Sequence, residues 1–195
     1  MRKRIFNVFM IIAIAAIIVN CKEKTKEANT SEAEAAAISE STTQKYVTDV
    51  TKSSIEWKGF KPTGTHYGTV NIDTGVFQVE GNAIQSGTFL IDMNSIVSLD
   101  LEEGKMKTNL ENHLKGTVEG KENDFFNVTQ FPTGAFEITG VNEEGGKTML
   151  SGNLTLKGIK QNITFPVSVA SEGDMLTMTI FTLNYLLMVL NYTWN

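Results

Sequence analysis

The sequence predicts an all-β domain, a sandwich or barrel of short antiparallel strands, with one short helical insertion. Three observations carry this prediction. In residues 46–179, apolar side chains recur at every second position within short segments, the period of a strand with one dry and one wet face. Glycine, asparagine and aspartate separate these segments at nearly regular intervals, as in β-sandwiches and barrels. Only residues 99–116 show helical spacing instead.

Residues 1–20 have the layout of a secretory signal peptide. A basic start precedes a continuous apolar run at residues 8–19, and the chain turns polar after Cys21. Even when it is counted from Ile5, the apolar run has roughly 15 residues, fewer than the ~20 that a membrane-spanning helix needs. We therefore expect this part of the chain to direct export.

Cys21, the single cysteine of the chain, follows this run in the motif Ile18-Val19-Asn20-Cys21. The motif resembles a bacterial lipobox, in which cleavage precedes a cysteine that becomes diacylated, although Asn20 stands where Gly, Ala or Ser is preferred. We predict lipidation at Cys21 and a location in the bacterial cell envelope, as an outer-membrane-anchored lipoprotein that is periplasmic or surface-exposed. The alternative is an uncleaved N-terminal anchor with an incidental cysteine.

The segment after Cys21 is predicted to be a flexible linker. Residues 22–44 contain one bulky aliphatic residue, Ile38, and no aromatic residue, so they have too little apolar surface to offset the entropy of ordering. The predicted organisation is therefore a signal peptide (1–20), a lipidated N-terminus and linker (21–45) and a β-domain (46–195).

The charge of the mature chain excludes one class of partner. Removal of residues 1–20 takes away three basic residues and no acidic one, which leaves 14 Lys and Arg against 22 Asp and Glu, a formal charge of −8. An acidic chain with no basic cluster is poorly suited to bind nucleic acid. We therefore predict no nucleic-acid partner, and membrane contact through the lipid anchor alone.

Apart from the turn of the hairpin described below, breaks between strands are expected at four places in the domain. These are residues 62–64, Asp73-Thr74-Gly75, Gly81-Asn82 and residues 143–146. The helical interval begins near Gly104, where Met106, Leu110, His113 and Leu114 recur at helical spacing. Strand character is expected to resume at residues 125–128.

The clearest hairpin covers residues 150–169. Leu150, Gly152, Leu154 and Leu156 share one face of its first arm, and Ile163, Phe165, Val167 and Val169 share one face of the second. Residues 157–161 supply the break, and Gly158 can adopt a backbone conformation that other residues avoid. The apolar face of this hairpin must be buried against something.

Several motifs resemble the YceI-like family. Residues 124–138, DFFNVTQFPTGAFEI, resemble its DFFdv..yP.a.F.i motif, and residues 151–159, SGNLTLKGI, are similar to its GnLTlkGvt motif. Shorter elements, Asn94-Ser95-Ile96 and His113-Leu114-Lys115, resemble its SI and HL elements in the expected order. The resemblance covers residues 53–169, and the compact hairpin at residues 64–70 is similar to the variant of Bacteroidota-type lipoproteins.

This resemblance implies an eight-stranded, antiparallel, lipocalin-like barrel with an inserted helix and a long apolar cavity for a polyisoprenoid or similar lipid. The expected lining residues are inward-facing and apolar: Trp57, Phe77, Phe89, Met93, Phe126, Phe136, Leu154 and Phe165. The same residues also suit a filled core, because a barrel of about eight strands is only just wide enough for side chains or one slender ligand.

His66 and His113 are the two histidines of the chain, and we expect them near the mouth of the cavity. For His113, a hydrogen bond to the barrel rim is the simpler interpretation than a catalytic or metal-binding role. His66 beside Tyr67 is interpreted as a turn or mouth residue. No spacing of Cys, His or carboxylates suggests a metal site, and no nucleophile motif is visible, so we expect no cofactor and no enzyme.

The C-terminal residues depart from the family pattern. After Phe181-Thr182-Leu183 the family continues with an Arg-x-x-Trp-like strand and a final strand, whereas residues 184–195 here are uncharged and largely apolar. We expect a truncation or a shifted reading frame near Asn184, a barrel that lacks its last strand, and an exposed sheet edge.

The predicted function is therefore an extracytoplasmic lipid-binding protein that sequesters or carries a polyisoprenoid or similar long-chain amphiphile. The alternative is a filled β-barrel that serves as a structural or interaction domain of the envelope. The sequence does not decide whether the protein forms a homodimer.

Overall fold

A computed structural model describes residues 30–39, 43–61, 64–81 and 83–180, which form nine strands and one helix. The predicted signal peptide, Cys21 and residues 181–195 lie outside the described residues. The elements are β1 (Thr30–Ser31), β2 (Gln44–Val47), β3 (Ser54–Lys61), β4 (Gly64–Glu80), β5 (Ala83–Ser98), α1 (Lys105–Lys115), β6 (Thr133–Glu144), β7 (Lys147–Leu156), β8 (Ile159–Glu172) and β9 (Met175–Ile180).

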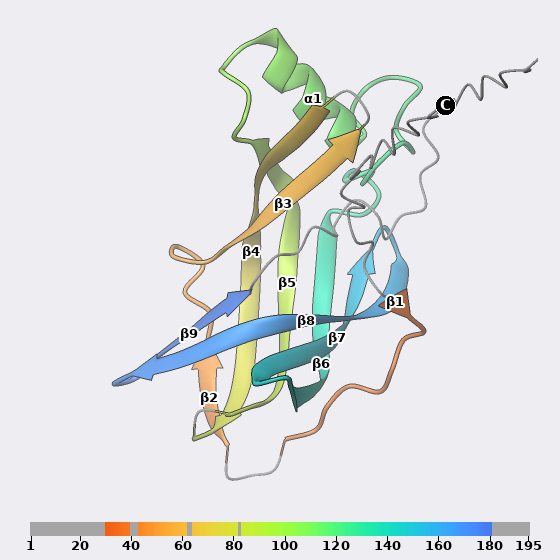
Figure 1. The fold of residues 1–195 in the computed structure, drawn as a ribbon. Helices are drawn as coiled ribbons and strands as arrows, with labels where there is room; N and C mark the ends of the chain where they lie inside the picture. Colours follow the sequence, from red (N-terminus) through yellow and green to blue (C-terminus); the bar gives the residue numbers. More distant parts are fainter. Residues whose placement is uncertain (1–29, 40–42, 62–63, 82, 181–195) are drawn as a thin grey trace, which may run out of the picture.

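All nine strands belong to one antiparallel sheet (Figure 1). From β4 to β9, each strand pairs with the strand that precedes it in the chain. The long strand β4 pairs with β5 along one edge, and with β3 and then β2 along the other. The prediction of an all-β antiparallel fold with one helical insertion is confirmed.

The sheet is strongly coiled, and its two halves enclose one core. In Figure 1, β8 crosses in front of β4 and β5, β9 lies beside it, and α1 stands at one end. Buried residues of both halves, such as Val79 and Ile84 on one side and Phe165 and Val167 on the other, belong to the same apolar cluster. Among the described residues β9 pairs only with β8, so within this part of the chain the sheet does not close into a barrel.

The hairpin of β7 and β8 follows the predicted alternation. Its inward positions are buried, apart from the half-buried Val169 near the end of the second arm. At the turn, Lys157 (φ 51°) and Gly158 (φ 75°) both have positive φ. This backbone pattern belongs to a type I′ turn, whose twist matches the twist of the paired strands.

Helix α1 begins directly after Gly104, as the sequence predicts, and ends at the left-handed Gly116. No helix of the described residues has the length and apolar character to span a membrane. Of the predicted apolar positions, Leu114 is buried, whereas Met106 is 73% exposed. The helix is therefore anchored to the rest of the molecule by its C-terminal half.

The prediction of a strand at residues 125–128 is wrong, because this stretch caps α1. Phe126 and Val128 donate backbone hydrogen bonds to the carbonyl oxygens of Leu114 and Lys115, which have no partner within the helix. Asn127 between them has a positive φ of 46°. Residues 125–128 are all buried, so their apolar character reflects packing rather than a sheet.

The break predicted at Asp73-Thr74-Gly75 is also wrong, because β4 continues through it. The register shifts there by one residue, from Ile72 opposite Ile91 to Thr74 opposite Leu90. Such a bulge bends a strand without ending it. A Cβ on Gly75 would lie 2.3 Å from the Thr48 hydroxyl, so the glycine permits the close approach of the chain that leads out of β2.

The prediction of a flexible linker over residues 22–44 does not hold for residues 30–37, which lie on the sheet. Thr30 and Ser31 pair with Ile163 and Asn162 on β8, and Ala37 donates a hydrogen bond to the carbonyl of Ile138. These contacts are made by the backbone, which explains why a composition poor in apolar side chains does not reveal them.

Candidate functional site

The inner face of the sheet carries a continuous row of four phenylalanine rings. The ring centroids of Phe77 and Phe89 are 6.1 Å apart, those of Phe89 and Phe136 are 5.1 Å apart, and those of Phe136 and Phe165 are 5.6 Å apart. The rings come from β4, β5, β6 and β8, respectively. The row therefore forms an aromatic band across most of the width of the sheet, in the range where aromatic pairs attract.

Inward-facing glycines make room for two of these rings. A Cβ on Gly152 would lie 2.2 Å from the ring of Phe136, and a Cβ on Gly87 would lie 2.9 Å from the ring of Phe77. Neither distance is compatible with a side chain. At these two places the space next to the sheet is filled by the rings themselves.

The structure brings all eight predicted lining residues into one apolar cluster. Seven of them are buried: Trp57, Phe89, Met93, Phe126, Phe136, Leu154 and Phe165. Phe77 is half-buried and packs against the same cluster. Phe126 reaches it from the loop after α1 and not from a strand. That these residues line a ligand cavity stays a prediction.

Trp57 has the only polar atom among these eight side chains, and it is satisfied. Its indole N–H lies 3.1 Å from the carbonyl oxygen of Val97 and 3.3 Å from that of Thr69. The ring lies against Gly68, where a Cβ would lie 2.8 Å from it. The indole is thus fixed in place, and its N–H is not an unsatisfied polar group in the apolar cluster.

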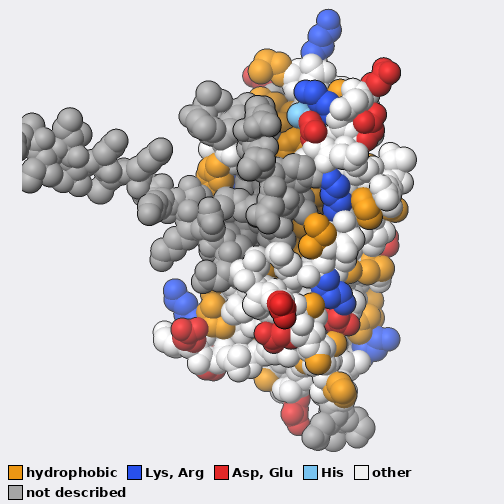
Figure 2. Space-filling model, turned by 90° about the vertical axis from the view of Figure 1, so that its right-hand side faces the viewer, with side chains coloured by type: hydrophobic (Ala, Val, Ile, Leu, Met, Phe, Trp, Pro, Cys, Tyr) orange, Lys and Arg blue, Asp and Glu red, His pale blue; other side chains and the backbone are white. Residues whose placement is uncertain are grey.

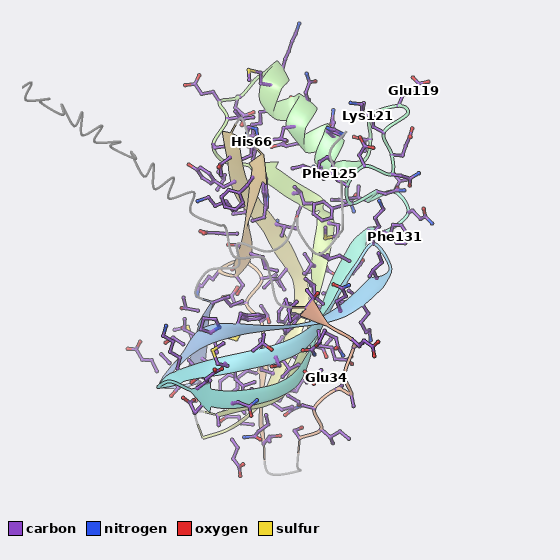
Figure 3. The ribbon with its side chains drawn as sticks, turned by 45° about the vertical axis from the view of Figure 1, so that its right-hand side comes forward. Glu34, His66, Glu119, Lys121, Phe125 and Phe131 are labelled. Atoms are coloured by element: carbon purple, nitrogen blue, oxygen red, sulfur yellow. The ribbon has the colours of Figure 1, made fainter. Side chains whose placement is uncertain are left out.

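His66 lies at the α1 end of the molecule (Figure 3) and is paired with a carboxylate. Its Nδ1 is 2.8 Å from Oδ2 of Asp100. The other oxygen of Asp100 accepts hydrogen bonds from the Tyr67 N–H and the Ser98 hydroxyl, both at 2.9 Å. Burial by itself would raise the pKa of Asp100, but the hydrogen bonds from Tyr67, His66 and Ser98 outweigh it and hold that pKa below its usual value.

His113 belongs to a second, separate pair. Its Nε2 is 2.7 Å from Oδ2 of Asp124, and its ring meets that of Phe125 edge to face at a centroid distance of 4.9 Å. Figure 3 shows Phe125 between α1 and the sheet. The pair ties α1 to the loop that caps it, whereas the sequence interpretation places the partner of His113 on the barrel rim.

The two histidines therefore do not converge on one catalytic centre. Each of them holds a different carboxylate, and α1 is joined to the sheet by a further bond from the Ser98 N–H to Oε1 of Glu111. In the described part of the chain, no group of three or more His, Cys, Asp or Glu side chains is placed to hold a metal ion. The α1 end is a polar rim above an apolar interior.

Sequence reasoning missed Asp100 and two buried asparagines of the outer face, Asn153 and Asn162. Asn153 is 1% exposed and Asn162 is 3% exposed, although both occupy positions that alternation assigns to the wet face. Asparagine is disfavoured in strands, so its presence at two paired strand positions is the signal that points to a special role.

Comparison with known proteins finds similarity to YceI proteins. The chain is 32% identical to Protein YceI of Salmonella arizonae and to that of Salmonella newport over 90 residues, which are 45% of this chain and 47% of each relative. The match thus spans about half the length of these curated relatives. A solved structure of a Campylobacter jejuni YCEI protein aligns over 72% of this chain and 65% of its own, with 15% identity and a TM-score of 0.36.

The family model described as the YceI-like domain matches residues 46–191. This range includes β2 from its third residue onward, all of β3 to β9 and α1. The match covers well over half of the chain, and the protein therefore belongs to the YceI-like domain family.

Proposed function

We propose that this protein is an extracytoplasmic lipid-binding protein that sequesters or carries a polyisoprenoid or a similar long-chain amphiphile on the inner face of its sheet. The observation that supports this most is the aromatic band of Phe77, Phe89, Phe136 and Phe165. A flexible hydrocarbon chain binds by removing apolar surface from water, at roughly 25 cal/mol per Å². The band has no polar group, but three of its rings are buried and Phe77 is half-buried, so a bound chain would replace side chains that now cover them.

Membership in the YceI-like family supports the same ligand class, because the resemblance implies a polyisoprenoid-type chain. The proposed location follows from the sequence: an apolar run at residues 8–19 followed by Cys21, which we propose to be the lipid anchor. The viewed face in Figure 2 shows acidic and basic side chains interspersed, without a patch of one sign. This supports a role that does not depend on nucleic acid.

We also propose that the protein is not an enzyme. His66 and His113 are the residues best suited to proton transfer, and each is engaged with a carboxylate that connects two elements. A general base needs a reacting group within hydrogen-bond reach. Their arrangement supports a structural role at the rim.

One observation favours a second candidate function, a filled β-domain that serves the envelope as a structural or interaction module. The ring of Phe136 occupies the space that a side chain on Gly152 would fill, so part of the interior is already packed. In this case the aromatic band stabilises the sheet and binds nothing.

Native mass spectrometry of the protein purified from its own cells separates the two functions. We expect a complex with the mass of one long-chain lipid, which exchanges when an isoprenoid alcohol is added. Leu154→Trp, which enlarges a buried side chain on the inner face, should remove most of the bound lipid. Thr155→Trp, one residue further on the outer face, should leave it in place. Absence of any co-purifying or exchangeable lipid in the wild type would establish the filled domain instead.

A further inference from the structure

A segment that precedes the family domain is held on the outer face of the sheet by a side chain that recognises its backbone. We call residues 30–37 the strap. Oδ1 of Asn153 accepts a hydrogen bond from the Glu34 N–H at 3.0 Å, and Nδ2 of Asn153 donates to the Glu34 carbonyl at 2.7 Å. One amide side chain thus satisfies both backbone groups of a residue 119 positions away.

The Asn153 amide is held in position by its neighbours on the sheet. Nδ2 of Asn162, the residue opposite on β8, lies 3.1 Å from Oδ1 of Asn153 and 2.9 Å from the Thr139 hydroxyl. Asn153 and Asn162 are both more than nine-tenths buried, although they lie on the outer face. A buried polar network in which every member has a partner gives specificity to the contact it makes.

Two further contacts extend the site on either side of Asn153. Towards its N-terminus, the strap pairs with β8, with Thr30 opposite Ile163 and Ser31 opposite Asn162. Towards its C-terminus, Ala37 donates to the Ile138 carbonyl at 2.9 Å. The strap therefore crosses β8, β7 and β6 in turn, and Figure 3 shows Glu34 next to these strands.

The last contact falls where the sheet splits. The pairing of β5 with β6 ends at Thr88 and Glu137, and beyond this point β6 pairs with β7 alone among the described strands. Ala36 and Ala37 line a pocket of about 280 Å³ at this split, together with Ser86, Gly87 and Ile138. Ala37 also packs against the core. Small side chains suit this place because they enter the split without displacing the strands.

We propose that this face is a docking site for the chain's own strap, and that Asn153 is the residue that recognises it. Recognition acts through the backbone of Glu34, whose side chain is exposed, so the site requires an N–H at position 34 and not a carboxylate. Ordering one residue of the strap costs backbone conformational entropy, and this cost is similar in size to the net free energy that one hydrogen bond contributes. Docking is therefore reversible.

Docking would set how far the sheet can lie from the proposed lipid anchor at Cys21. With the strap docked, residues 22–29 separate Cys21 from the sheet and span at most about 28 Å. With the strap released, residues 22–42 span at most about 74 Å. This consequence rests on the proposed lipid anchor at Cys21, whereas the docking itself does not.

Hydrogen–deuterium exchange on the full chain tests the docking, read at the peptide that covers residues 30–39. Asn153→Ala removes both bonds to Glu34 and should speed exchange of the Ala37 amide by about tenfold or more. Thr155→Ala, on the same face of β7, is the matched control and should leave it unchanged. Glu34→Pro, which lacks the N–H, should reproduce the effect of Asn153→Ala, and Glu34→Ala should not.

Three results would overturn the proposal. Unchanged exchange of Ala37 in Asn153→Ala would show that Asn153 does not hold the strap. Equal acceleration in Asn153→Ala and Thr155→Ala, or faster exchange of β4 and β5 in either, would indicate general loosening of the sheet. A dimer in light scattering that dissociates in Glu34→Pro would show that the strap docks on a second copy. None of these readouts depends on lipid binding or on lipidation.

Discussion

At the scale of single residues, Gly152 and Phe136 share one piece of the interior. A Cβ at residue 152 would lie 2.2 Å from the Phe136 ring, and 2.5 Å and 2.8 Å from two further ring atoms. We predict that Gly152→Ala lowers the free energy of unfolding by about 1–3 kcal/mol, the usual effect of overpacking a core. Urea denaturation measures this change.

Gly140 provides the control, because a Cβ there would meet nothing within 4 Å and the residue does not have a positive φ. Gly140→Ala should leave stability unchanged or raise it by about 0.4–1 kcal/mol through the unfolded state. Equal losses in the two variants would mean that the Phe136 ring is not tightly packed against β7.

Asp100 gives the protein a pH dependence of known sign. Its pKa is lowered in the folded state, so its stabilising contribution is fully present above the ordinary carboxyl pKa of 3.8 and is lost as the pH falls through the lower folded value. We predict that Asp100→Asn has a lower free energy of unfolding than the wild type at pH 6. The difference in free energy of unfolding between the two proteins should become smaller below pH 3.8. Denaturant midpoints at pH 6 and pH 3 measure both gaps.

Asp73→Asn, at an exposed carboxylate of β4, serves as the comparison, and the change in stability that it shows at each pH is subtracted from that of Asp100→Asn. A gap for Asp100→Asn that stays constant between pH 6 and pH 3 would contradict the role given to the Tyr67 and Ser98 bonds.

At the scale of elements, the end of α1 depends on one glycine. Gly116 has a φ of 70°, and a Cβ there would lie 2.5 Å from the Glu122 carbonyl oxygen in the capping loop. Gly120 has a similar φ of 77° with no atom within 4 Å. Both alanine variants incur left-handed backbone strain of roughly 1–2 kcal/mol. Only Gly116→Ala adds a clash, so the difference in stability between the two variants reports the clash.

We therefore predict that Gly116→Ala unfolds at a lower temperature than Gly120→Ala, and that both unfold below the wild type. Calorimetry measures the order. If Gly120→Ala were the less stable variant, the close contact between α1 and its capping loop would play no part in stability.

The elements also show what sequence reasoning can and cannot reach. The β7–β8 hairpin was predictable because burial alternates along it with period two, and the start of α1 because Gly104 precedes the helical spacing. The strand expected at residues 125–128 failed because buried apolar side chains look the same in a strand and in a capping loop. Only the tertiary partners of the Phe126 and Val128 N–H groups distinguish the two.

The candidate site likewise contains residues that the sequence predicts and contacts that only the fold reveals. Its eight apolar residues were predictable from hydrophobic alternation and the family resemblance: seven belong to the core cluster and Phe77 packs against it. The carboxylate partners of His66 and His113 lie 34 and 11 positions away, so their pairing depends on the fold. Alternation along β7 assigned Asn153 to the wet face, because this pattern carries no information about a distant segment that covers the strand.

At the scale of the whole molecule, a bound lipid would stabilise the fold. A ligand that binds only the native state raises the free energy of unfolding by about 2.7 kcal/mol at 100 times its Kd. For a domain of this size we expect the melting temperature to rise by roughly 5–10 °C when a long-chain isoprenoid alcohol is added to delipidated protein. Scanning calorimetry measures the shift.

A short-chain alcohol with the same head group is the control, since it buries too little hydrocarbon to match this effect. An unchanged melting temperature with the long-chain alcohol, at concentrations up to its solubility, would favour the filled domain.

The pairing of the strap with β8 also has a consequence for the order of events during synthesis. Strands β3 to β9 pair with neighbours in sequence, so each pair can form soon after its second strand is made. Glu34 and Asn153 are separated by 119 positions. At about 5–20 residues per second, the strap is made roughly 6–24 s before the side chain that holds it. The first described segment of the chain to be synthesised is therefore among the last to find its place.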